Sequence, residues 1–254
     1  MRSRSLAALA LLVAVALLPV GCSSSAPGSN TEKVTLTVSA AASLKKSFTA
    51  LAEQFSADNP DIEVEFNFDG SQALVTQIDQ GANVDVLATA DEKNMRKLGD
   101  KITDPRIFAT NVLTIVTQPG NPENIQGLAD LTKSDVTTVI CAVDVPCGSA
   151  TAEVEKDAGV DIKPVSEETA VTGVLTKVQT KQADAGLVYV TDAAGAGDTV
   201  TSVSDPAFAA VVNKYPIGVV AATKNKEAAQ QFVDMVLGTK GSSLLESQGF
   251  GPAT

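Results

Sequence analysis

A regular alternation of strand-type and helix-type segments begins at Lys33, and it constrains the fold more than any other feature of this sequence. The segment "KVTLTVSAA" carries apolar Val34, Leu36 and Val38 at every second position, which is typical of a strand. The next segment, "SLKKSFTALAEQFSADNP", repeats its apolar residues at helical spacing and stops before Pro60. A strand is therefore followed at once by a helix, as in an α/β protein.

The same pattern continues along the chain. We expect further strands in "IEVEFNF", "VDVLATA", "NVLTIVTQ", "TTVICA", "ADAGLVYV" and "YPIGVVAAT". We expect helices in "SQALVTQIDQG" and "DEKNMRKLGD", near 149–158 and 168–181, and in a helical tail from Lys226 to Phe250. This alternation predicts an α/β fold with mainly parallel sheets. Neither a GxGxxG turn after a strand nor a GxxxxGK[ST] loop occurs, so nucleotide binding is not indicated.

The N-terminus has the organisation of a signal peptide. Two arginines precede an unbroken apolar run, Leu6 to Leu18, which is shorter than the ~20 residues of a membrane-spanning helix. Gly21 precedes Cys22, as in a lipoprotein signal, although Pro19 stands where such signals usually carry Leu. We therefore expect a signal peptide over residues 1–21 and lipidation of Cys22. Plain secretion with cleavage elsewhere is the alternative.

The segment after Cys22 is small and polar. "SSSAPGSNTE" offers nothing to bury in a core, so residues 22–32 are expected to be a lipid-anchor cysteine and a flexible tether. No other apolar run of the sequence is long enough to span a bilayer. The sequence thus predicts an exported protein, anchored by lipid to the outer face of the cytoplasmic membrane.

Composition excludes several classes of function. The chain has no histidine, which removes the Ser-His-Asp triad, the Cys-His dyad and every histidine-containing metal set. Its net charge of −11 argues against nucleic acid, whose affinity for proteins comes from Lys and Arg contacts to phosphates. We therefore expect no enzyme activity, no cofactor and no directly coordinated metal.

Cys141 and Cys147 lie in the stretch "VTTVICAVDVPCGSATAEVEKDAG". Export places them in an oxidising compartment, which favours a disulfide over two free thiols. Two thiols without other soft ligands are a poor zinc site. The sequence predicts that the pair braces the turn between a strand and a helix.

Small polar residues follow several of the expected strands. Ser43 and Ser71 each stand at the start of a helix, and Cys147 with Gly148 precede a third. Ligands of open α/β sheets bind at the carboxyl ends of strands, where helix N-termini offer unpaired N–H groups to anions. A serine before a helix is also an ordinary N-cap, so spacing alone leaves both interpretations open.

Several motifs together resemble one family. "VSAAASLKKSF", "FDGSQALVTQIDQGANVDVLATADEKNM", "VPCGSA", "AVTGVLTKVQTKQADAGLVYVTDAA" and "SQGF" are similar to the molybdate-binding solute receptors of ABC transporters. The resemblance extends from Lys33 to Phe250. It implies a type II periplasmic-binding-protein fold, with two Rossmann-like lobes and a ligand cleft between them. It also implies a monomer that delivers its ligand to an ABC permease.

The resemblance implies that residues 33–112 plus 218–254 form lobe 1 and that residues 113–217 form lobe 2. It also implies the ligand set, position by position. Ser43 of "AAASL" and Ser71 of "DGSQAL" would give hydroxyl and N–H donors, and Tyr189 of "LVYVTDA" its hydroxyl. Val171 of "ETAVTGVL" would give a backbone N–H, and so would Cys147, which stands where the family has Ala. Without the resemblance, Val171 would be assigned to the core and Tyr189 to a strand with a locally satisfied hydroxyl.

These implied donors are all neutral, and the implied ligand set contains no Asp or Glu. Such a set favours molybdate, tungstate or sulfate, which are fully deprotonated near neutral pH, over phosphate, whose proton needs an acceptor. Molybdate, with tungstate, is the expected ligand, and sulfate is the alternative. An exported enzyme on the same fold and a structural or signalling lipoprotein remain as hypotheses of other classes.

Overall fold

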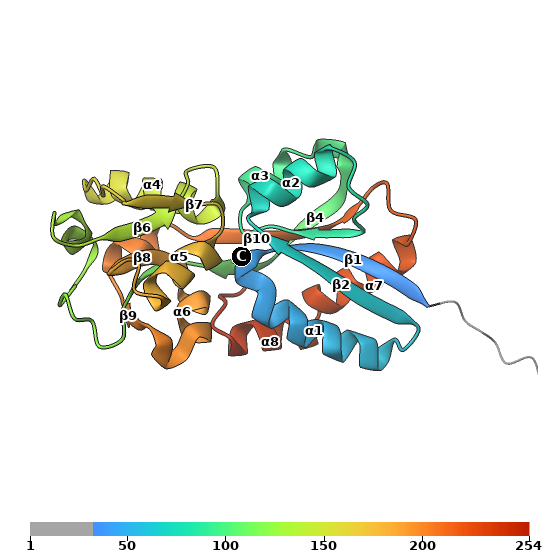
Figure 1. The fold of residues 1–254 in the computed structure, drawn as a ribbon. Coiled ribbons are helices and arrows are strands. Elements are labelled where there is room, and N and C mark those ends of the chain that lie inside the picture. Colours follow the sequence, from blue (N-terminus) through green and yellow to red (C-terminus); the bar gives the residue numbers. More distant parts are fainter. Residues whose placement is uncertain (1–32, 254) are drawn as a thin grey trace, which may run out of the picture. The chain divides into compact units, whose positions relative to one another are not determined.

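A computed structural model describes residues 33–253 (Figure 1). The expected signal peptide, the anchor Cys22 and the tether up to residue 32 lie outside these residues. The described chain forms two five-stranded sheets with helices packed against them. Within this part of the chain, no helix is long and apolar enough to cross a membrane.

The first sheet has the strand order β2-β1-β3-β10-β4. Its strands are β1 (Val34–Ala41), β2 (Ile62–Asp69), β3 (Val86–Ala88), β4 (Ile102–Asn111) and β10 (Asn213–Val220). Its helices are α1 (Lys45–Asp58), α2 (Ser71–Asp79), α3 (Glu92–Arg96), α7 (Lys226–Leu237) and α8 (Thr239–Ser247). The expected return to lobe 1 at residue 218 falls inside β10, which belongs to this sheet from Asn213 onward.

The second sheet has the order β7-β6-β8-β5-β9. Its strands are β5 (Leu113–Thr117), β6 (Thr138–Cys141), β7 (Ser166–Glu168), β8 (Ala185–Tyr189) and β9 (Thr201–Val203). Its helices are α4 (Pro146–Ala158), α5 (Val171–Gln179) and α6 (Val190–Ala196). In Figure 1, α4 covers one face of this sheet and α5 covers the other.

Side-chain alternation explains why the first sheet is covered on both faces. In β3, Val86 and Ala88 join the main apolar core, whereas Leu87 between them joins a second core with α2 and α3. On the main-core face, the rings of Phe48, Phe55 and Phe232 from α1 and α7 pack edge to face, with centroids 5.3–6.0 Å apart. Figure 1 shows α1, α7 and α8 on one side of the sheet and α2 and α3 on the other.

The expectation of mainly parallel sheets is wrong, because both sheets are mixed. In the first sheet, β1 runs parallel to β2 and β3, whereas β10 is antiparallel to β3 and β4. In the second, β6 is parallel to β7 and β8, whereas β5 is antiparallel to β8 and β9. Parallel neighbours need a long crossover connection, usually a helix. The chain instead passes from β4 to β5 through Val112 alone, and β10 returns from the second sheet without a crossover helix.

Several elements also differ from the expected ones, and β7, β9 and α6 were not predicted at all. Strand β4 was not expected, and its position at the sheet edge tolerates Pro105, which has no N–H donor. The helical tail is two helices, α7 and α8, that meet at Gly238. Helix α4 begins at Pro146, so Cys147 and Gly148 lie in its first turn rather than before it.

Candidate anion-binding site

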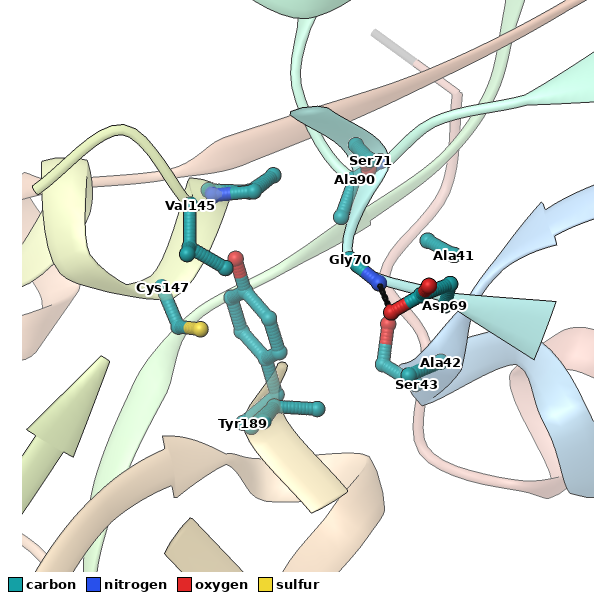
Figure 2. Close-up of a pocket in the computed structure, with 12 residues that line it drawn as sticks. Ala41, Ala42, Ser43, Asp69, Gly70, Ser71, Ala90, Val145, Cys147 and Tyr189 are labelled. Carbon is teal, nitrogen blue, oxygen red and sulfur yellow. Dashed lines mark hydrogen bonds between the residues drawn. The ribbon is translucent and has the colours of Figure 1, made fainter. Parts of the chain in front are cut away.

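One pocket collects all five residues that the sequence singled out. Ser43, Ser71, Cys147, Val171 and Tyr189 line it together, and Figure 2 draws most of them around the same space. The other residues on its wall are Ala41, Ala42, Asp69, Gly70, Ala90, Val145 and Pro146. The wall is built from residues at or shortly after the carboxyl ends of β1, β2, β3, β6, β7 and β8, which is where α/β proteins bind ligands.

Three helices begin at this pocket. Helix α2 begins at Ser71, α4 at Pro146 and α5 at Val171. The first N–H groups of a helix have no intrahelical partner, and they carry the positive end of the helix dipole. The pocket therefore offers backbone donors from both sheets to a single anion.

Neither serine caps its helix. Gly70 is the N-cap residue of α2, and Leu44 is that of α1, which follows the short 3-10 turn Ala42–Leu44. Neither helix receives a side-chain hydrogen bond at its N-cap. The ordinary capping interpretation is thus wrong for Ser43 and Ser71, and both hydroxyls are available for other contacts.

A chain of hydrogen bonds orients the hydroxyl of Ser43. Asn111 Oδ1 accepts the Val112 N–H at 3.0 Å, which identifies Nδ2 as the donor end of that amide. Asn111 Nδ2 donates to Tyr215 Oη at 3.5 Å, and Tyr215 Oη lies 3.1 Å from Ser43 Oγ. Either hydroxyl can be the donor in the contact between Ser43 and Tyr215. When Tyr215 donates, the hydrogen of Ser43 is left for a ligand in the pocket.

The hydroxyl oxygen of Ser71 accepts an internal hydrogen bond. The Ala90 N–H donates to Ser71 Oγ at 3.0 Å, so the oxygen is used as an acceptor and the hydroxyl hydrogen remains free. Ala90 is itself held in place, because Asn213 Nδ2 donates to its carbonyl oxygen at 2.9 Å. Both contacts are buried, which protects them from competing water.

Tyr189 ends β8 with its side chain at the pocket. The side chain is 1% exposed, and its hydroxyl has no hydrogen-bond partner among the described residues. A buried hydroxyl without a partner costs about 1–3 kcal/mol, so its presence calls for an acceptor from elsewhere. Burial raises the pKa of Tyr189 well above its usual value, so the group stays a hydroxyl donor across the physiological pH range.

Cys147 supplies a backbone N–H group to the pocket and is one half of a disulfide. It forms a disulfide with Cys141 at the end of β6, as predicted, with the two Cα atoms 5.7 Å apart. Gly148 follows where the chain turns tightly, because a Cβ atom there would lie 1.9 Å from the Ala142 carbonyl oxygen. The N–H of Cys147 lies in the first turn of α4, where no intrahelical acceptor exists.

Asp69 was not among the residues identified from the sequence. It is the last residue of β2 and lines the pocket, and its Oδ1 accepts the Gly70 N–H at 2.7 Å, drawn as a dashed line in Figure 2. The implied ligand set contains no Asp or Glu, yet a carboxylate-bearing residue lines the pocket. The family motif pointed to Ser71, two residues later, as the ligand residue. Asp69 could have been found from the sequence, because it is an acidic residue at the carboxyl end of an expected strand.

The described wall of the pocket carries no Lys or Arg. In the described part of the chain, no group of three or more His, Cys, Asp or Glu is placed to hold a metal ion. The attraction for an anion would come from hydroxyl groups, backbone N–H groups and helix dipoles.

Two mixed α/β sheets, with a pocket at the strand ends of both, define a two-lobed solute-binding protein. The sequence profile described as bacterial extracellular solute-binding protein matches residues 36–251. The chain therefore belongs to this family of extracellular binding proteins. It is 46% identical over 239 residues to the molybdate-binding protein ModA of Mycobacterium tuberculosis, covering 91% of this chain and 92% of that protein.

Solved structures share the fold. The periplasmic molybdate-binding protein of Azotobacter vinelandii aligns with a TM-score of 0.74 at 21% identity, covering 85% of this chain and 98% of the other. The sulfate-binding protein SubI of Mycobacterium tuberculosis aligns with a TM-score of 0.74 at 18% identity, covering 86% and 87%. These relatives are named as binding proteins, which agrees with the expectation of a receptor rather than an enzyme.

Proposed function

We propose that this protein is an extracytoplasmic receptor that captures molybdate, and tungstate with it, and delivers it to an ABC permease. The binding residues would be Ser43, Ser71 and Tyr189 through their hydroxyls, with backbone N–H groups of Cys147 and Val171. The 46% identity to a protein named for molybdate binding supports this choice of ligand.

One observation carries the proposal. The three pocket hydroxyls can each direct a hydrogen to a ligand, because Ser43 Oγ can accept from Tyr215, Ser71 Oγ accepts from the Ala90 N–H, and the Tyr189 hydroxyl has no partner among the described residues. Molybdate is fully deprotonated near neutral pH and can accept at every oxygen. Hydrogen bonds to charged acceptors contribute about 1.5–3 kcal/mol each, so neutral donors can hold a buried oxyanion without a cation.

The same proposal covers the cellular setting. Cleavage before Cys22 and lipidation of that residue would tether a monomeric receptor to the outer face of the membrane, next to its permease. Mass spectrometry of the exported protein tests this part separately. A diacylglyceryl-modified N-terminal Cys22 is expected, and an unmodified N-terminus would contradict anchoring without affecting ligand binding.

Isothermal titration calorimetry with molybdate, tungstate, sulfate and phosphate tests the ligand. We expect molybdate and tungstate to bind at least about tenfold more tightly than sulfate, a difference of about 1.4 kcal/mol. A preference for sulfate over molybdate would assign the receptor to the smaller dianion. Binding of phosphate with none of molybdate would contradict the proposal.

A further inference from the structure

We propose that Gln72 is a positioning residue that holds the two walls of the pocket together and slows the release of a bound oxyanion. Gln72 is not among the residues that line the pocket. It would act through the neighbouring donors rather than by touching the ligand. The inference rests on the proposed function, because it assumes that the pocket binds an oxyanion.

The donors of the pocket are closed off from solvent. Ser71 and Tyr189 are each 1% exposed, and Cys147 is 2% exposed. Ser71 begins a helix of the first sheet, whereas Cys147 and Tyr189 belong to elements of the second. A ligand that reaches all three residues lies between the two walls, so the walls must separate for it to leave. Contacts between the walls therefore oppose its release.

A side-chain hydrogen bond from Gln72 joins the two walls. Gln72 lies in the first turn of α2, next to Ser71, and its Nε2 donates to the Thr169 carbonyl oxygen at 2.8 Å. Thr169 lies between β7 and α5, two residues before Val171. The bond thus ties the segment that carries Ser71 to the segment that carries Val171.

The Gln72 side chain makes no other hydrogen bond with a described residue. Because Nε2 donates to a carbonyl oxygen, the orientation of the amide is determined, and Oε1 is buried without a partner in the described part of the chain. The side chain therefore does not brace its own helix. Its single hydrogen bond is with the opposite wall.

Gly70 permits this contact. Its φ of −59° and ψ of 138° suit any residue, so backbone freedom does not explain the glycine. A Cβ atom at this position would lie 2.2 Å from the Thr169 carbonyl oxygen and 2.6 Å from the Gln72 side-chain amide. Glycine therefore lets the turn before α2 approach the same carbonyl that Gln72 binds.

The position of the bond separates it from a contact at the chain crossing. Among the described residues, the other side-chain hydrogen bonds between elements of the two sheets are those of Asn111. Its Nδ2 donates to Thr191 Oγ1 at 2.8 Å, beside Val112, where the chain passes from one sheet to the other. Contacts at the crossing can persist when the walls move, whereas the bond between Gln72 and Thr169 has to break.

Gln72→Met removes the donor, keeps an unbranched side chain of similar length and leaves the charge unchanged. Gln80→Met is the matched control, because Gln80 is exposed at the other end of α2 and its side chain makes no hydrogen bond with a described residue. The two variants therefore differ in the contact with Thr169.

Exchange of bound radiolabelled molybdate for unlabelled molybdate gives the off-rate of wild type and both variants. Calorimetric titration gives Kd, and the off-rate divided by Kd gives the on-rate. In Gln72→Met we expect the off-rate to rise at least about threefold while the on-rate stays within about twofold of wild type. Gln80→Met should match wild type in both rates, and thermal unfolding verifies that each variant is folded.

An unchanged off-rate in Gln72→Met would overturn the role of Gln72. So would an equal rise in Gln80→Met, or a loss of affinity that lies entirely in the on-rate. If wild type binds radiolabelled sulfate and not molybdate, the proposed ligand is wrong, and the same exchange with sulfate then tests Gln72. Binding of neither anion would overturn both proposals.

Discussion

Replacing Tyr189 with Phe should lower ligand affinity without lowering stability. The Tyr189 hydroxyl is buried and makes no hydrogen bond among the described residues, so the folded protein loses no internal hydrogen bond when it is removed. Removing an unsatisfied buried polar group is neutral or stabilising, by up to about 1–3 kcal/mol. If the hydroxyl donates to a bound oxyanion, its loss costs about 1.5–3 kcal/mol of binding, which is roughly a 10- to 150-fold weaker affinity.

Tyr215→Phe is the comparison for stability, since the chain has two tyrosines and this hydroxyl has internal partners. The Tyr215 hydroxyl contacts Ser43 and Asn111, so its removal should destabilise the fold by about 0.5–1.5 kcal/mol. Urea unfolding gives the stability of each variant, and calorimetric titration with molybdate gives its affinity. An unchanged affinity in Tyr189→Phe, or a clear loss of stability, would refute the assignment of this hydroxyl to the ligand.

Three further predictions concern the frame around the pocket. Gly148→Ala should destabilise the protein by about 1–3 kcal/mol in urea unfolding, because its Cβ atom would overlap the Ala142 carbonyl oxygen; an equally stable variant would contradict the tight turn. Reducing the Cys141–Cys147 disulfide should cost about 2 kcal/mol of stability by the loop-entropy argument. It should also weaken molybdate binding measurably. An unchanged affinity would mean that the disulfide does not position α4. Burial raises the pKa of Asp192 to about 7, so its neutral form stabilises the fold at low pH and that contribution is lost as pH rises through about 7. The stability of Asp192→Asn relative to wild type should therefore increase from about pH 4 to about pH 8 in urea unfolding, and a constant difference would contradict the raised pKa.

Local patterns predicted the longer strands and helices but not β4, β7, β9 or α6, and the family motifs supplied the five residues that line the pocket. Alternating Val34, Leu36 and Val38 define β1, and the family motifs placed Ser43 and Ser71 at the ends of neighbouring strands. Strand direction was not predictable in the same way. It depends on how the chain passes between the sheets, and neither the short step at Val112 nor the return through β10 has a periodic signature.

The hydrogen-bond partners of the pocket residues could not be predicted from the sequence either. The contact between Ser43 and Tyr215 joins positions 172 residues apart, and the contact between Ala90 and Asn213 joins positions 123 apart. Such pairs arise from strand order, which a single sequence does not contain. Asp69 was missed for a different reason, since it stands inside the matched motif "DGSQAL" but is not one of the ligand residues that the resemblance implies.

A crystal structure of the protein with molybdate, with anomalous data collected at the molybdenum edge, tests the central claim most directly. We expect one strong anomalous peak in the pocket, with ligand oxygens about 2.7–3.2 Å from the hydroxyls of Ser43, Ser71 and Tyr189 and from the first N–H groups of α4 and α5. A peak elsewhere would contradict the account, for example in the separate pocket beside Asp79 and Lys101. So would a molybdate in the expected place whose oxygens make no contact with these donors.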